Sequence, residues 1–309
     1  MYTPSSHLDL ENIKLYESKK MDLRGAIVFD GFPSVGLVST IATNYLINVL
    51  ELEQIGIIDS PIFPALSIIR NGEPLSPVRI YGGRKKGKDG SSESLNIVAF
   101  ISEFAPPISM IKDLAKVIIN FAVENNCKMI ITPEGWAVEG REFPELPPGE
   151  DEEETEMEKS AKVIHQVLEK EKEKSSSQQK KKTSQQNKVR KVPVYGVGST
   201  AYAREYLKRS HVLPFLNGAI TGVSGVLLNE GKKRNRDVIC LLAEAHQNYP
   251  DARAAASIVD TIDRMLFNIE IDPKPLFEEA EIIESQILMM HSQVKADATA
   301  TKPPRYMYG

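Results

Sequence analysis

Four polar side chains near the end of a predicted strand have the chemistry of an acid, a base and a cation. The apolar run at 238–243 is typical of a buried strand, and α/β folds bind ligands beyond the carboxyl ends of such strands. The residues that follow it include Glu244, His246, Asp251 and Arg253. Asp251 would also serve as the N-cap of a predicted helix, and no nucleophile accompanies His246. We therefore expect a weak ligand cluster here and no catalytic residue.

The chain offers little else that would support catalysis or metal binding. Its five histidines are never three or four residues apart, and neither cysteine has a partner at ligand spacing. The segment GVGS at 196–199 follows a strand as a phosphate loop would, but lacks the third glycine and the lysine of such loops. The segment GFPSVG at 31–36 could likewise aim backbone N–H groups at an anion. A tight strand–helix turn explains the first segment more simply, and close packing of a helix on a sheet explains the second. We predict no metal and no cofactor.

The last three residues, Met307, Tyr308 and Gly309, have the chemistry of a docking peptide. Tyrosine combines an apolar body with a polar tip, methionine is flexible, and a lysine or a backbone nest on a partner can capture a terminal carboxylate. The residues before them lack apolar periodicity, and Pro303-Pro304 favours an extended backbone. We therefore expect 296–309 to be a flexible tail that presents its end to another protein.

The composition is that of an ordinary globular protein. The 309 residues are 41% hydrophobic and 26% charged, which is enough for one large core or two small ones. A net charge of −4 does not indicate nucleic-acid binding. No apolar run approaches the ~18 residues of a membrane span. Cys127 and Cys240 lie in or beside apolar runs, as core thiols do in a reducing compartment. We expect a cytoplasmic protein that binds neither membrane nor nucleic acid.

Buried strands alternate with amphipathic helices along the chain, which predicts an α/β layered sheet with parallel crossovers. The predicted strands are 25–30, 54–59, 66–70, 77–81, 95–101, 128–132, 192–197, 216–221 and 238–243. The predicted helices are 34–50, one ending near 125, 200–209, 222–232, 251–267 and 276–292. Asn71-Gly72 is a hairpin signal, although Pro74 and Pro77 argue for a looser connection. Gly135 is expected to end its strand.

The middle of the chain differs in composition. Residues 150–158 include seven acidic side chains in nine positions, and a helix is predicted to continue to about 174. The segment SSSQQKKKTSQQNKVRK at 175–191 is polar and basic, and cannot bury enough apolar surface to offset its ordering entropy. We predict a single α/β domain at 1–295 with a partly disordered insertion at 150–191, followed by the tail at 296–309.

Several separate blocks resemble the proteasome assembly chaperone family, in its archaeal branch. They occur in order between about 25 and 285: GFPSVGLVSTIATNYLI (31–47), RNGEPLSPVRIY (70–81), SEFAPP (102–107), GAITGVSGVLL (218–228), YPDARAAASIVDTIDRML (249–266) and DPKPLFEEAEIIE (272–284). The resemblance implies a three-layer α/β/α sandwich similar to the nucleoside phosphorylase-like fold, without that activity. It also implies homo-oligomers and binding to the 20S proteasome or its α subunits.

Some members of this family end in the hydrophobic–tyrosine–any motif that proteasome activators insert between neighbouring α subunits. By that resemblance Met307 would supply an apolar contact, Tyr308 the aromatic anchor and Gly309 the carboxylate for a pocket lysine. The insertion departs from the usual family pattern and has no assigned role. Two other functions stay open at this point: a small-molecule enzyme, such as a nucleoside phosphorylase or an ATP-dependent ligase, and a structural oligomer with an inert tail.

Overall fold

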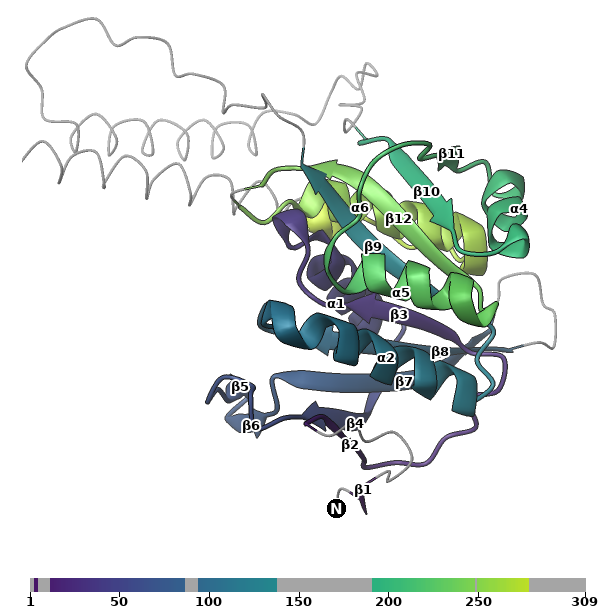
Figure 1. Cartoon of the computed structure of the whole chain (residues 1–309). Helices are drawn as coiled ribbons and strands as arrows, with labels where there is room; N and C mark the ends of the chain where they lie inside the picture. The colour runs from purple at the N-terminus through teal and green to yellow at the C-terminus, as the bar shows by residue number, and fades with distance from the viewer. Residues whose placement is uncertain (1–2, 5–11, 87–93, 138–190, 248, 278–309) are drawn as a thin grey trace, which may run out of the picture. The chain divides into compact units, whose positions relative to one another are not determined.

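The computed structural model describes residues 3–4, 12–86, 94–137, 191–247 and 249–277 (Figure 1). The tail at 296–309, nearly all of the insertion at 150–191 and most of the predicted helix at 276–292 lie outside these residues. The described segments before and after the insertion form one unit, because strands from both are neighbours in the same sheet.

Ten strands of the described chain form one mixed sheet. In spatial order they are β1 (Thr3–Pro4), β2 (Lys14–Glu17), β4 (Glu53–Asp59), β7 (Val78–Lys86), β8 (Ser94–Ser102), β3 (Ile27–Gly31), β9 (Met129–Ala137), β12 (Val238–Ala245), β10 (Val194–Gly198) and β11 (Leu213–Pro214). The four central strands, from β8 to β12, run parallel, which confirms the predicted crossovers. Antiparallel pairing outside them, as in β7–β8 and β10–β12, makes the sheet mixed.

Helices cover both faces of the sheet and complete the expected three layers (Figure 1). One face packs against α1 (Val38–Val49) and α6 (Ala252–Ile262), and α4 (Ala201–Arg209) joins this layer near β10. The other face packs against α2 (Ile108–Glu124) and α5 (Gly222–Arg234). No helix in the described part of the chain has the length and apolar content needed to cross a bilayer.

Helix α1 forms because its buried residues recur at helical spacing. Val38, Ala42 and Leu46 are fully buried and lie four residues apart, so they share the face that packs on the sheet. The helix crosses β3 so closely that a Cβ on Gly31 would lie 2.8 Å from Thr43 Cβ. Close helix–sheet packing is therefore the reason for this glycine, as predicted.

One predicted strand boundary and one predicted strand are wrong. Strand β9 does not end at Gly135 but continues to Ala137. A Cβ on Gly135 would lie 1.9 Å from the Val35 carbonyl oxygen, so the glycine allows a loop to approach the strand instead of breaking it. The predicted strand at 216–221 is not formed. Leu216 is 81% exposed there, and Gly218 has a φ of +152°, so this run has no apolar face to bury.

Strands β5 (Ile68–Arg70) and β6 (Glu73–Leu75) form a separate two-stranded hairpin. Asn71 and Gly72 connect them with φ values of +51° and +81°, the positive pair of a tight type I′ turn. The looser connection expected from Pro74 is therefore wrong. Both strands are edges of this small sheet, so the missing N–H of proline removes no necessary ladder bond.

Candidate functional site

A buried carboxyl group in β3, that of Asp30, is hydrogen-bonded to a pair of hydroxyl groups, and the partly buried carboxyl group of Glu134 in β9 lies nearby. Asp30 is 1% exposed and accepts hydrogen bonds from the Phe32 N–H at 3.2 Å and the Thr132 hydroxyl at 3.1 Å. The Thr132 hydroxyl also lies 2.5 Å from the Ser224 hydroxyl in α5. The Glu134 carboxyl lies close enough to Ser224 and Asp30 for both to affect its pKa. We call the group Asp30, Thr132, Ser224 and Glu134 the carboxyl network.

Both acids of the carboxyl network hold their protons more tightly than usual. Burial raises the pKa of Asp30 to about 6, although the bonds from Phe32 and Thr132 oppose this shift. Burial also raises the pKa of Glu134 to about 7, and the nearby negative charge of Asp30 adds to the effect. The network therefore titrates near neutral pH, where ordinary carboxyl groups are already ionised.

The loop between β3 and α1, residues 32–37, is fixed beside this network by side-chain bonds. Ser34 Oγ accepts from the Ser39 N–H at 3.0 Å, and the Ser39 hydroxyl donates to the Asp30 carbonyl at 2.7 Å. Gly36 adopts a φ of +61°, and its carbonyl accepts from the Asp251 N–H at 2.7 Å. The loop thus connects the end of β3 to the start of α6.

Within the predicted ligand cluster, Asp251 is a structural residue. Its side chain is buried; Oδ1 accepts from the Ala254 N–H at 2.9 Å and Oδ2 from the His246 N–H at 3.1 Å. The predicted N-cap of α6 is therefore confirmed. The His246 ring stacks on Tyr249 with ring centroids 4.4 Å apart. Both oxygens of the Asp251 carboxylate thus accept hydrogen bonds from backbone N–H groups.

The other predicted site residues are placed as follows. Glu244 lies in β12, opposite Trp136 of β9, and is partly buried. Arg253 lies in the first turn of α6 and is also partly buried. Met307, Tyr308 and Gly309 lie outside the described residues. Two members of the ligand cluster, His246 and Asp251, are thus brought into direct contact.

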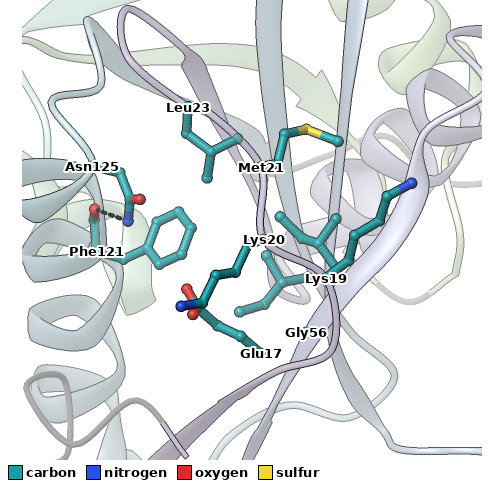
Figure 2. A pocket seen from close by; sticks show the side chains of 10 residues that line it. Glu17, Lys19, Lys20, Met21, Leu23, Gly56, Phe121 and Asn125 are labelled. Atoms are coloured by element: carbon teal, nitrogen blue, oxygen red, sulfur yellow. Dashed lines mark hydrogen bonds between the residues drawn. The ribbon is translucent and has the colours of Figure 1, made fainter. Parts of the chain in front are cut away.

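A cavity of about 190 Å³ lies away from these residues, between β4, β7, the segment after β2 and the end of α2 (Figure 2). Phe121 and Asn125 from the end of α2 line one wall, and Lys19 and Met21 from the segment after β2 line the opposite one. A second hollow of about 290 Å³ lies between β10, β11 and α6. Both are below the ~300–1,000 Å³ typical of small-molecule pockets.

Sequence reasoning missed the carboxyl network. Asp30 and Glu134 are 104 positions apart and fit no spacing motif. The available signal was the type of residue that ends each buried strand, because α/β folds gather such side chains at one edge of the sheet. Asp30 ends the apolar run AIVF, and Glu134 follows MIITP.

Comparison with known proteins identifies the family. The model of the PAC2 family matches residues 28–290, so the chain belongs to that family and the resemblance stated from the sequence is confirmed. An uncharacterized protein of Methanocaldococcus jannaschii is 23% identical over 284 residues, which cover 92% of this chain and 93% of that protein.

Two solved structures from Pyrococcus furiosus share the fold. PbaA, described as an archaeal homolog of proteasome-assembly chaperone, is 27% identical with a TM-score of 0.66, over 94% of this chain and 96% of PbaA. PbaB, described as an archaeal proteasome activator, is 22% identical with a TM-score of 0.64, over 91% of this chain and 100% of PbaB. The likeness to both runs through nearly the whole length of each protein.

Proposed function

We propose that this protein is a non-enzymatic proteasome assembly chaperone or proteasome-binding adaptor, and that it docks its C-terminal tail into pockets on 20S α subunits. The observation that carries the proposal is the likeness to PbaA, which is 27% identical over 94% of this chain. Membership of the PAC2 family supports it. In this proposal the protein acts on the proteasome in the cytoplasm and binds neither membrane nor nucleic acid.

The tail has suitable chemistry for each contact of such a pocket. Met307 supplies an apolar contact, Tyr308 the aromatic anchor and Gly309 the carboxylate, which a lysine of the pocket would hold. The 14 residues at 296–309 can extend at most ~45 Å, which is sufficient to reach a neighbouring ring.

A homo-oligomer would compensate for the weakness of a single tail. Three anchoring residues bury little area, and binding must order the segment that carries them, so one tail binds weakly. When several tails belong to one oligomer, every contact after the first is intramolecular, and avidity can rise ~10²–10⁴-fold. We therefore propose that the protein acts as a homo-oligomer.

Deletion of residues 307–309 tests the docking function. Purified 20S proteasome is captured with the full-length and the truncated protein, and the oligomeric state of both is measured by light scattering. The proposal predicts that truncation abolishes capture and leaves folding and oligomer size unchanged. Equal capture by the two proteins would remove the tail from the mechanism.

The competing function is a small-molecule enzyme on the same fold. The observation that favours it is the carboxyl network, since its two acids with raised pKa values lie at the carboxyl ends of parallel strands. This function predicts that nucleosides, phosphate or ATP raise the melting temperature, and that His246→Ala or Arg253→Ala reduces the shift. Unchanged melting temperatures with all these ligands would count against the enzyme. The deletion of residues 307–309 also tests the third function, a structural oligomer with an inert tail.

A further inference from the structure

The two edges of the β5–β6 hairpin differ in their hydrogen-bonding groups. In an antiparallel pair, opposite residues alternate between those that exchange both backbone hydrogen bonds and those that exchange none. Arg70 and Glu73 flank the two-residue turn and form a bonded pair, so Ile69 and Pro74, the next pair, form no bond with each other. The N–H and carbonyl groups of Ile69 therefore point outward from β5. Pro74 has no N–H to present on the outer edge of β6.

The outer edge of β5 lacks the protection that the large sheet has at both of its edges. That sheet ends in β1 and β11, which are two residues long and contain Pro4 and Pro214. Prolines, short strands and charged side chains at an edge prevent the addition of another strand. The ten residues 60–69 contain no charged side chain, and β5 contains no proline. Among the described residues, none bonds the outward N–H or carbonyl group of Ile69.

Exposed aliphatic side chains lie beside this edge. Ile69 is 64% exposed, and Leu66, just before β5, is 43% exposed. The Arg70 guanidinium lies 3.0 Å from the Glu103 carboxylate, which places β5 beside the segment that leads into α2 (Figure 1). Ile108, the first residue of α2, is 88% exposed. Apolar side chains next to unpaired backbone groups are typical of surfaces that bind another protein.

We propose that the outer edge of β5 binds an extended, uncharged segment of a partner protein as an added β-strand. Ile69 would supply one N–H donor and one carbonyl acceptor to this strand. Because Arg70 faces Glu103 and side chains alternate along a strand, Ile69 and Pro74 face away from the body. The added strand would extend the apolar row of Pro74 and Ile69 by one side chain. The site does not involve the tail, so it goes beyond the proposed docking function.

The area and charge of the edge favour a single segment over a second folded copy. Burial of one aliphatic side chain removes about 60–120 Å² of apolar surface from water. Leu66, Ile69 and Ile108 together supply at most ~400 Å² on this scale, about half of the ~800 Å² that each partner buries in a stable interface. An added strand gains affinity from backbone hydrogen bonds and needs no large face. Arg70, the only charged residue of β5, is already paired with Glu103, so an uncharged segment fits this edge best.

Hydrogen exchange of the full-length protein, followed by NMR, tests whether the edge is open. The Ile69 N–H should exchange at close to the intrinsic rate of an unstructured peptide. The Arg70 N–H, which is bonded to Glu73 across the hairpin, should exchange at least roughly fivefold more slowly, as for one ordinary hydrogen bond. A protected Ile69 N–H would show that another part of this chain or a second copy already covers the edge, and would overturn the proposal.

Binding of a synthetic peptide tests the added strand. The probe is a capped, fluorescently labelled heptapeptide of alternating valine and threonine, and the control is the same peptide methylated at every backbone nitrogen. Fluorescence anisotropy should show that the full-length protein binds the control at least roughly tenfold more weakly, since several hydrogen bonds of about fivefold each are lost. No binding of the probe, or equal binding of the two peptides, would overturn the proposal.

Two variants locate the peptide on β5. Ile69→Pro removes the outward N–H but leaves the bonds between Arg70 and Glu73, so it should weaken binding at least roughly fivefold while the Arg70 N–H stays protected. Ile69→Val keeps the N–H and a β-branched side chain, so it should bind the probe almost normally. Deletion of residues 307–309 should leave peptide binding unchanged, which separates this site from the docking function. Equal affinity of Ile69→Pro and Ile69→Val would place the peptide elsewhere and overturn the proposal.

Discussion

Replacement of Asp251 by alanine would reveal how much of the structure depends on this carboxylate. The substitution removes the cap bond from Ala254 N–H at 2.9 Å and the bond from His246 N–H at 3.1 Å. Loss of an N-cap costs ~0.5–2 kcal/mol. A buried N–H left without an acceptor costs ~1–3 kcal/mol, and water has little access because Asp251 is 5% exposed. We expect the free energy of unfolding to fall by about 2–4 kcal/mol.

Urea unfolding followed by far-UV circular dichroism measures this loss, with Asp251→Asn as the matched control. The asparagine keeps one oxygen acceptor for the cap but offers N–H₂ where His246 N–H needs an acceptor. It should therefore lose less stability than alanine does. A loss below about 1 kcal/mol for Asp251→Ala would refute the two-bond role. Capture of the 20S proteasome should be unchanged in both variants under conditions where they are folded.

Three further predictions concern the described structure. Gly135→Ala should destabilise the protein by at least about 2 kcal/mol in urea unfolding, because the new Cβ would lie 1.9 Å from the Val35 carbonyl oxygen. An unchanged free energy of unfolding would contradict that packing. Arg79→Met should lower the free energy of unfolding by ~3 kcal/mol, because this fully buried side chain pairs with Glu103. Arg70 pairs with the same carboxylate oxygen but is 45% exposed, so Arg70→Met should lower it by under ~1 kcal/mol. Equal losses would contradict the role of burial. The pKa of Asp30 is raised in the folded state to about 6, so with respect to this group stability should be greatest below pH 4 and fall by about 3 kcal/mol as the pH rises through 6. Asp30→Asn should flatten this dependence, and an equally steep fall in the variant would contradict it.

The sequence was informative wherever burial alone decides the structure. Helix α1 and strand β12 follow from apolar periodicity, because their residues pack directly on the core. Gly135 was misinterpreted because a glycine that ends a strand and one that admits a neighbouring loop look alike until the loop is placed. The run at 216–221 resembles a strand in composition, but among the described residues it pairs with no strand.

The candidate site was harder to predict because its residues come from distant parts of the chain. Asp251 could be identified as a cap from its position before a helix, which is a local property. The relation between Asp30 and Glu134 depends on strand order, since β3 and β9 become neighbours only when the sheet forms. The hydroxyl group of Ser224, which contacts Thr132, comes from a third element, α5. The proposed docking tail could be predicted without the fold, because the proposal depends on the chemistry of three consecutive residues.

The central claim, that Tyr308 anchors the protein on the proteasome, is tested most directly by comparing two tyrosines of the same tail. Binding of Tyr308→Ala and Tyr306→Ala to immobilised 20S proteasome is measured by surface plasmon resonance beside the full-length protein. Because only Tyr308 belongs to the docking tripeptide, we predict at least a roughly tenfold loss of affinity for Tyr308→Ala, as for a lost aromatic hot spot, and near-normal binding for Tyr306→Ala. Equal affinity of the two variants would contradict the account.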